Sequence, residues 1–227
     1  KVISGAEFAD NLTDQAMALG ADVELEKVIS VEKQEGKFLV STEEGSTYEA
    51  GAVILALGVK HRMLGLPGEE ELVGNGISFC AVCDGAFYQG KTVALVGGGN
   101  SALQEAILLS EGCEKVYVVQ NLDYLTGEPA LQEIIAKRDN VEVLTGTVVD
   151  ALPAAAPLTS ITLRRVADSH VYDLAVDGVF VAIGLVPENG AFASVAALDE
   201  RGYVDAGEDC RTATAGVFVA GDCRRKT

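Results

Sequence analysis

The sequence from Thr92 to Glu105 reads TVALVGGGNSALQE, in which an apolar run is followed by three glycines and then by helix-forming residues. The pattern G-x-G-x-x-A lies here between a predicted strand and a predicted helix, the setting in which it is typical of dinucleotide-binding turns. Its first glycine allows the tight turn, its second lets backbone amides approach a pyrophosphate, and its alanine keeps helix and strand close. A glycine-rich turn that binds nothing is the alternative. The candidate nucleotide-binding residues are Gly97, Gly99, Asn100, Ser101 and Ala102.

The segments that flank this turn predict an α/β fold with a parallel sheet. Short apolar runs alternate with helical patterns, as in a β-α-β-α-β unit. The predicted strands are 92–96, 115–119 and 141–144, and the predicted helices are 100–111 and 128–137.

Antiparallel meanders and further buried strands complete the predicted fold. Helical spacing of apolar residues predicts an amphipathic helix from Ser4 to Gly20. Strands 52–57 and 179–183 are apolar throughout, which predicts that both of their faces are covered. Small antiparallel meanders are predicted for 28–32, 38–42 and the segment near Tyr48, and for 161–165 and the segment near Val171.

Three buried strands bounded by glycines recur at 51–58, 178–184 and 216–221, without a fixed period. A glycine at the carboxyl edge of such a strand lets the backbone approach a large ligand, which makes Gly58 and Gly221 candidates for cofactor binding. Asp222 follows and places a carboxylate where it can accept hydrogen bonds from the hydroxyls of a cofactor. Tight turns, and a helix cap at Asp222, remain as alternatives.

The end of the second predicted strand, 115–119, is where a nucleotide-binding fold holds the ribose. Gln120 and Asn121 stand there, and both can hydrogen-bond a ribose hydroxyl. They offer neither an anion for NAD nor a cation for a 2′-phosphate, so the bare pattern leaves the nucleotide open.

The five cysteines include one pair with informative spacing, Cys80 and Cys83 in the segment CAVCDG. Two thiols at this spacing predict thiol-disulfide exchange, in which Asp84 shuttles the proton that a departing thiolate gains or loses. Half of a zinc site is the alternative, but it needs two more ligands, and the other cysteines are solitary. We therefore expect no metal. The solitary cysteines are Cys113, Cys210 and Cys223.

Composition and charge exclude several classes of function. Asp and Glu number 34 against 17 Lys and Arg, and the net charge of −17 repels phosphate backbones, so a nucleic-acid partner is not expected. The apolar runs are far shorter than the roughly 20 residues of a membrane span, so no membrane association is expected. With two isolated histidines, a His-based hydrolase triad is disfavoured. No secretory leader precedes the first helical pattern, and we predict a cytoplasmic location.

Taken together in this order, the segments Cys80–Gly85, Gly97–Glu105, Val181–Pro187 and Gly216–Asp222 resemble the low-molecular-weight, bacterial-type thioredoxin reductases over nearly all 227 residues. This resemblance implies a two-domain flavoprotein disulfide reductase, in which a Rossmann-like nucleotide domain is inserted in a split FAD domain. The implied domains are 1–64 and 185–227 for the FAD domain, both incomplete, and 65–184 for the pyridine-nucleotide domain with its Cys-x-x-Cys.

The resemblance also implies a role for each residue of the redox pair. Cys83 corresponds to the sulfur next to the flavin, and Cys80 to the sulfur that exchanges with the disulfide of thioredoxin. Asp84 corresponds to the acid-base group and Asp222 to the carboxylate on the ribityl chain of FAD. Electrons then pass from NADPH or NADH to FAD, to the dithiol and to thioredoxin or a thioredoxin-like protein, in a homodimer.

The sequence departs from this family at two places. The family begins with a strand and a G-x-G-x-x-G for FAD, and it continues beyond the position of Asp222 into a further helix. Neither is found here, which predicts an internal fragment. The basic cluster that binds the 2′-phosphate is replaced by Gln120-Asn121-Leu122-Asp123, with Thr126 following, which disfavours NADPH. The alternatives are a related disulfide reductase that takes electrons from ferredoxin or another donor, and a non-catalytic nucleotide-binding or zinc-structured module.

Overall fold

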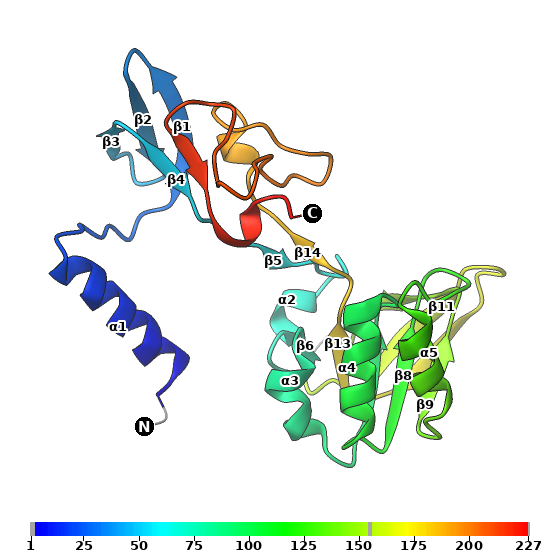
Figure 1. Cartoon of the computed structure of the whole chain (residues 1–227). Helices are drawn as coiled ribbons and strands as arrows, with labels where there is room; N and C mark the ends of the chain where they lie inside the picture. The colour runs from blue at the N-terminus through cyan, green and yellow to red at the C-terminus, as the bar shows by residue number, and fades with distance from the viewer. Residues whose placement is uncertain (1–2, 154–155, 227) are drawn as a thin grey trace. The chain divides into compact units, whose positions relative to one another are not determined.

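The chain folds into two compact units, shown in Figure 1. The structure is a computed structural model that describes residues 3–153 and 156–226. One unit combines Lys1–Gly58 with Pro187–Thr227, and the other is Val59–Val186. The sequence-based domain bounds are 64/65 and 184/185, whereas the two units divide at 58/59 and 186/187, and the outermost residues of those bounds, 1 and 227, fall outside the described residues.

The core of the unit Val59–Val186 is a parallel five-stranded sheet in the order β6-β13-β7-β8-β9. The β-α-β-α-β arrangement predicted around the glycine turn is confirmed, because β7, β8 and β9 alternate with α4 and α5. The strands are β6 (Ile77–Ser78), β7 (Thr92–Val96), β8 (Lys115–Val119), β9 (Val141–Leu144) and β13 (Gly178–Val181), and the helices are α4 (Asn100–Ser110) and α5 (Pro129–Ala136).

Each face of this sheet has its own apolar core. Val93 and Leu95 of β7 pack with the helices α4 and α5, which lie in front of the sheet in Figure 1, whereas Ala94 and Val96 pack with the meander β10–β12 on the other face. Successive side chains of a strand point to opposite faces, so a strand without polar residues needs this double cover. The meander consists of β10 (Thr147–Ala151), β11 (Ser160–Arg165) and β12 (Val171–Ala175), of which β10 was not predicted.

The other unit is built on an antiparallel meander and a parallel strand pair. The predicted meander is confirmed as β1-β2-β3, and the buried residues Val31 and Phe38 share a core with Leu55 and Val217. The helix predicted at the N-terminus is α1, whose N-cap Ser4 accepts a hydrogen bond from the amide of Glu7. The elements are α1 (Gly5–Ala18), β1 (Val28–Gln34), β2 (Lys37–Thr42), β3 (Thr47–Ala50), β4 (Val53–Leu55) and β15 (Val217–Val219), with short 3-10 turns at Gly190–Phe192 and Gly221–Cys223.

The prediction that the apolar segment 52–57 is covered on both faces is wrong for this chain. Leu55 is buried, but Ile54 is 69% exposed. The strand pairs in parallel with β15 only, and alternation turns Ile54 to the face opposite Leu55, which no described element covers.

The glycine-rich segment after Gly58 contains ordered structure. It forms β5 (Lys60–His61), which pairs with β14 (Leu185–Val186), and the helical turn α2 (Glu69–Leu72). Glu69 is only 2% exposed, and its carboxylate accepts hydrogen bonds from the amides of Leu64 (2.7 Å) and Gly65 (2.8 Å). The loop is therefore held by a buried side chain.

Replacing Glu69 with alanine should destabilise the protein by about 1–3 kcal/mol, because the part-buried amides of Leu64 and Gly65 lose their acceptor. Glu69→Gln keeps one side-chain oxygen and should cost less. Urea unfolding measures both, with the exposed neighbour changed in Glu70→Ala as the control, for which less than about 0.5 kcal/mol is expected. Equal stabilities for Glu69→Ala and Glu70→Ala would contradict this role.

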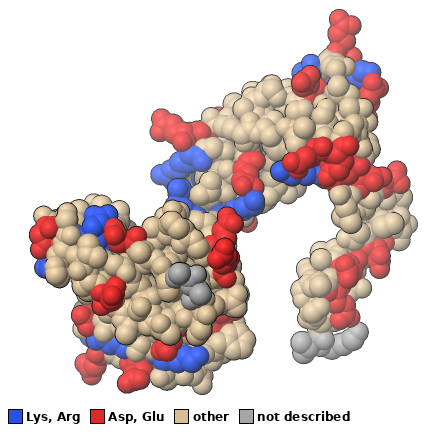
Figure 2. All heavy atoms as spheres, turned by 180° about the vertical axis from the view of Figure 1, so that it is seen from behind, with Lys and Arg blue, Asp and Glu red and all other residues tan. Residues whose placement is uncertain are grey.

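Among the described residues, no helix is both long and apolar enough to cross a membrane. Figure 2 shows acidic side chains over the visible face of each unit, in keeping with the excess of Asp and Glu, 34 against 17 Lys and Arg.

Candidate active site

The two cysteines of the CAVCDG segment form a disulfide. Their sulfur atoms are 2.09 Å apart, and both belong to the unit Val59–Val186. Cys80 is the N-cap of the short helix α3 (Ala81–Asp84), and its sulfur accepts a hydrogen bond from the amide of Cys83 at 3.1 Å. Cys80 is half-buried and Cys83 is exposed, so a second disulfide has access to the pair.

Asp84 lies at the end of the same helix, and a hydrogen bond from a residue of the sheet fixes its carboxylate. Its Oδ2 accepts a hydrogen bond of 2.6 Å from the hydroxyl of Ser78, the last residue of β6. The same hydroxyl accepts a hydrogen bond of 3.1 Å from the amide of Cys80. Ser78 was missed by the sequence analysis, where the only available signal is a small polar residue that ends a strand two positions before the first cysteine.

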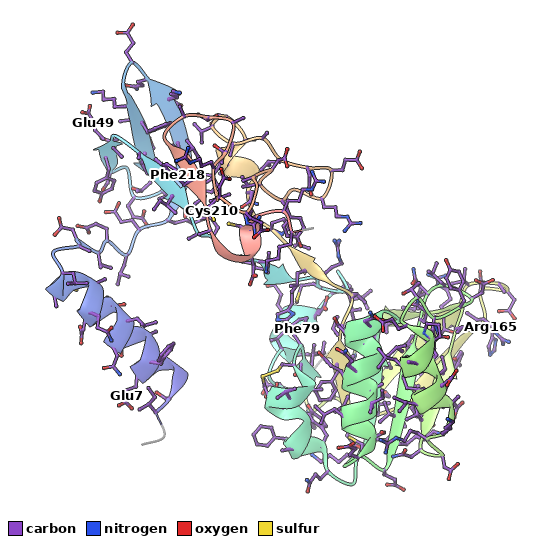
Figure 3. All side chains as sticks on the ribbon, viewed as in Figure 1. Glu7, Glu49, Phe79, Arg165, Cys210 and Phe218 are labelled. Atoms are coloured by element: carbon purple, nitrogen blue, oxygen red, sulfur yellow. A yellow bond between two sulfur atoms is a disulfide. The ribbon has the colours of Figure 1, made fainter. Side chains whose placement is uncertain are left out.

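The glycine turn and the end of β8 border one cleft of ≈ 570 Å³. Its lining also includes His61, Phe79 and Glu105, none of which was predicted as a site residue. The rings of His61 and Phe79 stack with centroids 4.9 Å apart, and Phe79, labelled in Figure 3, directly precedes Cys80. The predicted residues that the cleft brings together are Gly97, Gly99, Asn100, Ser101, Ala102, Gln120 and Asn121.

The backbone of the turn fits a pyrophosphate. Gly97 has φ +138°, and a Cβ there would lie 2.4 Å from the carbonyl oxygen of Ala182, so the position requires glycine. A Cβ on Gly99 would meet only Thr126 Oγ1, at 3.8 Å, and would project into the cleft. Gly99 is also the N-cap of α4, whose first amides are free to face a bound anion.

The side chains around the turn limit which nucleotide fits. Gln120 is only 6% exposed, lies against Gly98 and donates a hydrogen bond to the carbonyl of Tyr124 at 3.3 Å. Asn100 exchanges hydrogen bonds with Glu128 through its amide group (2.9 and 2.7 Å). Among the described residues that line the cleft there is no Lys or Arg. The cleft suits the pyrophosphate and the ribose hydroxyls better than it suits a 2′-phosphate.

Burial raises the pKa of the Glu105 carboxyl above its usual 4.5, and a hydrogen bond from the backbone of Ala81 partly opposes this. One of its oxygens, Oε2, is buried without a hydrogen-bond partner among the described residues. Glu105 thus extends from the nucleotide cleft to Ala81, one of the two residues between the cysteines of the redox pair.

The raised pKa of Glu105 makes a prediction for stability against pH. The folded state holds this proton more tightly than the unfolded state, so the stabilisation is complete below the unfolded pKa and is lost as pH rises through the folded pKa. Glu105→Gln should therefore remove the part of the decline in unfolding free energy that Glu105 causes as pH rises above its usual pKa of 4.5, less than about 1 kcal/mol given its partial exposure. Urea unfolding at pH values below and above this pKa measures it, with the exposed Glu114→Gln as control. An unchanged slope in Glu105→Gln would refute the prediction.

The predicted cofactor residues of the other unit lie at the carboxyl ends of its parallel strand pair. Gly58 follows β4 and Gly221 follows β15, both with positive φ (+64° and +76°), and a Cβ on either would meet nothing within 4 Å. Asp222 is exposed and pairs with Lys226. Open glycines at neighbouring strand ends and an accessible carboxylate fit a cofactor that carries hydroxyl and phosphate groups, such as FAD.

The remaining cysteines are unpaired. Cys113 and Cys223 are buried, and burial raises the pKa of the Cys113 thiol. Cys223 lies with its sulfur 3.6 Å from the carbonyl of Leu55. Cys210, labelled in Figure 3, is half-buried in the same unit as Cys223.

The arrangement of a nucleotide-type cleft and a redox disulfide in one unit agrees with the family described as pyridine nucleotide-disulphide oxidoreductase, which residues 2–227 match. Thioredoxin reductase from Treponema pallidum is 37% identical over 225 residues, covering 99% of this chain and 73% of the relative. Thioredoxin reductase from Listeria innocua is 38% identical over 230 residues, covering 99% and 70%. The chain therefore belongs to the thioredoxin reductases within the pyridine nucleotide-disulphide oxidoreductase family.

Solved structures agree with this assignment. The chain superposes on thioredoxin reductase from T. acidophilum with a TM-score of 0.74 at 32% identity, and on that from Streptococcus pyogenes with 0.75 at 34% identity. Each comparison covers 99% of this chain and 74% of the other. The predicted α/β fold of the flavoprotein disulfide reductases is thereby confirmed, and membership of the family implies the use of FAD and a nicotinamide nucleotide.

Proposed function

We propose that the chain catalyses the reduction of the disulfide of thioredoxin, or of a thioredoxin-like protein, by a nicotinamide nucleotide through FAD and the Cys80–Cys83 pair. The observation that carries this proposal is the disulfide itself, half-exposed and with Asp84 beside it, in the same unit as the glycine-turn cleft. The relatives named thioredoxin reductase support the choice of substrate. A zinc-structured module accounts less well for two sulfurs already bonded to each other.

In this proposal each sulfur has its own task. The reduced Cys80 attacks one sulfur of the thioredoxin disulfide, which forms a mixed disulfide and releases the other thioredoxin sulfur as a thiolate. The Cys83 thiolate then attacks the Cys80 sulfur, which regenerates the Cys80–Cys83 disulfide and releases the second thiolate. Asp84 supplies one of the two protons that thioredoxin gains, and the solvent supplies the other.

The two units hold the two cofactors in this account. The unit Val59–Val186 binds the nucleotide through Gly97, Gly99 and the first amides of α4, while Gln120 and Asn121 bond the ribose. The other unit contacts FAD through Gly58, Gly221 and Asp222. Bound there, FAD would supply the chemistry that takes up a hydride from the nucleotide and delivers two electrons to the disulfide. We further propose that the protein acts as a homodimer in the cytoplasm, as the resemblance implies.

The preferred nucleotide in this proposal is NADH. A 2′-phosphate needs a cation, and the described residues lining the cleft include no Lys or Arg. We expect the KM for NADPH to exceed that for NADH by roughly tenfold or more, equivalent to about 1.4 kcal/mol of binding. Leu122→Arg should lower the KM for NADPH, whereas Val171→Arg, on β12 outside the cleft lining, adds the same charge without this effect. Equal use of both nucleotides by the unchanged protein would count against the preference.

The proposal is tested by anaerobic titration of the full-length protein, followed at the flavin absorption band, and then by steady-state reduction of thioredoxin. Bleaching by NADH and turnover of thioredoxin are expected. A flavin that stays oxidised with both nucleotides would point to ferredoxin or another donor. Bleaching without reduction of thioredoxin would refute the substrate.

A further inference from the structure

Ser78 is a polar residue of the sheet that hydrogen-bonds to α3 and its N-cap Cys80. It is 5% exposed and stands in β6, where Ser78 pairs with Phe180 of the buried strand β13. Its hydroxyl contacts Asp84 and Cys80, both in the short segment that carries the disulfide. A buried hydroxyl on a rigid strand can fix the position of side chains in the more exposed helix beside it.

The hydroxyl of Ser78 has one proton and two lone pairs, which decides how it is shared. The proton belongs to the 2.6 Å contact with Asp84 Oδ2, because a carboxylate can only accept. One lone pair accepts the amide of Cys80 at 3.1 Å. The carbonyl of Cys80 lies 3.5 Å away and is a weaker acceptor for the same proton.

This geometry serves both protonation states of Asp84. When Asp84 is ionised, Ser78 donates to it. When Asp84 carries a proton on Oδ1, its Oδ2 still accepts the Ser78 hydrogen bond, and the Oδ1 proton is available for transfer. The carboxyl group is held at the same place before and after it gives up its proton.

We propose that Ser78 is a positioning residue for proton transfer in the dithiol step, acting through Asp84. The proposal rests on the role of Asp84 in the proposed function. In the step concerned, the bond between the two sulfurs of the substrate breaks as a bond forms between Cys80 and one of them. The departing thiolate takes the proton of Asp84, which becomes a carboxylate that receives the Ser78 hydrogen bond.

The test uses substrates whose leaving groups differ in their need for a proton. A thiolate of low pKa leaves without protonation, whereas an alkyl thiolate leaves faster when a proton is supplied. The full-length protein is reduced with dithiothreitol, desalted and mixed with either 5,5′-dithiobis(2-nitrobenzoate) or hydroxyethyl disulfide. This readout requires no nucleotide, no flavin turnover and no thioredoxin, so it separates failure of this inference from failure of the proposed function.

For Ser78→Ala we expect the rate with hydroxyethyl disulfide to fall about tenfold. The rate with 5,5′-dithiobis(2-nitrobenzoate) should stay within about twofold of that of the unchanged protein. Asp84→Asn should give the same selectivity with a larger loss, and the double variant should be no slower than Asp84→Asn alone. Ser110→Ala removes another buried hydroxyl, which donates a hydrogen bond to the carbonyl of Ile107, and serves as the matched control.

Two results would overturn the inference. If Ser78→Ala slowed the reaction with both disulfides equally, the role of Ser78 would be structural only. If the rate losses of Ser78→Ala and Asp84→Asn multiplied in the double variant, Ser78 would not act through Asp84. If Ser78→Ala does not fold, Ser78→Gly also removes the hydroxyl without adding a thiol, and it should show the same selectivity. Ser78→Thr, which retains the hydroxyl, should restore the rate.

Discussion

Cys83→Ser in the full-length protein is expected to reduce thioredoxin at no more than the background rate, a loss of roughly 10³-fold or more. Exchange through a dithiol needs a second sulfur that resolves the mixed disulfide, and a serine hydroxyl cannot do so. Reduction of the flavin by the nucleotide does not involve this sulfur and should remain. Stopped-flow absorbance at the flavin band and steady-state thioredoxin reduction measure the two steps separately.

The matched control is Cys210→Ser, which removes a half-buried, unpaired cysteine of the other unit. It should leave both steps unchanged. Thioredoxin reduction by Cys83→Ser above background would contradict the assignment of the dithiol. Loss of flavin reduction in the same variant would mean that the substitution disturbs more than the exchange step.

Substitution of the two pattern glycines should separate folding from nucleotide binding. Gly97→Ala forces a Cβ to within 2.4 Å of the Ala182 carbonyl oxygen at φ +138°, so it should destabilise the protein by about 2 kcal/mol or more. Gly99→Ala has φ −86° and open space around its Cβ, so the fold should tolerate it. The new methyl group would occupy the approach of the pyrophosphate, and NADH affinity should fall about tenfold or more.

Thermal unfolding and NADH titration of both variants measure these effects. The expected pattern is a lowered Tm for Gly97→Ala, and an unchanged Tm with weakened NADH binding for Gly99→Ala. Gly190→Ala is a control outside the cleft, because a Cβ there meets nothing within 4 Å. Unaltered NADH affinity in Gly99→Ala would place the nucleotide elsewhere.

Local patterns in the sequence were sufficient to predict the nucleotide-type unit. The glycine turn, the strands around it and the helices α4 and α5 follow from spacing along short stretches, and the structure has them within a few residues. Strand β10 was missed because its sequence, TVVDA, shows no regular alternation of apolar and polar residues.

Contacts between distant segments account for what sequence patterns could not supply. His61 and Phe79 reach the cleft from segments that carry no nucleotide-binding pattern, and their ring contact depends on the pairing of β5 with β14. The burial of Glu69 was hidden in a run of three glutamates that reads as solvated. The exposure of the Ile54 side chain could not be predicted from the sequence either, because hydrophobicity alone does not tell which element covers a strand.

In the proposed reaction, electrons from the nucleotide arrive at the Cys80–Cys83 disulfide. The experiment blocks the unpaired thiols of the flavin-containing full-length protein with one alkylating reagent, adds NADH without oxygen, and labels new thiols with a second, isotopically heavier reagent. Peptide mass spectrometry should then find the heavy label on Cys80 and Cys83 and on neither when NADH is omitted. If NADH bleaches the flavin while both cysteines stay unlabelled, the electrons do not reach this disulfide and the account is wrong.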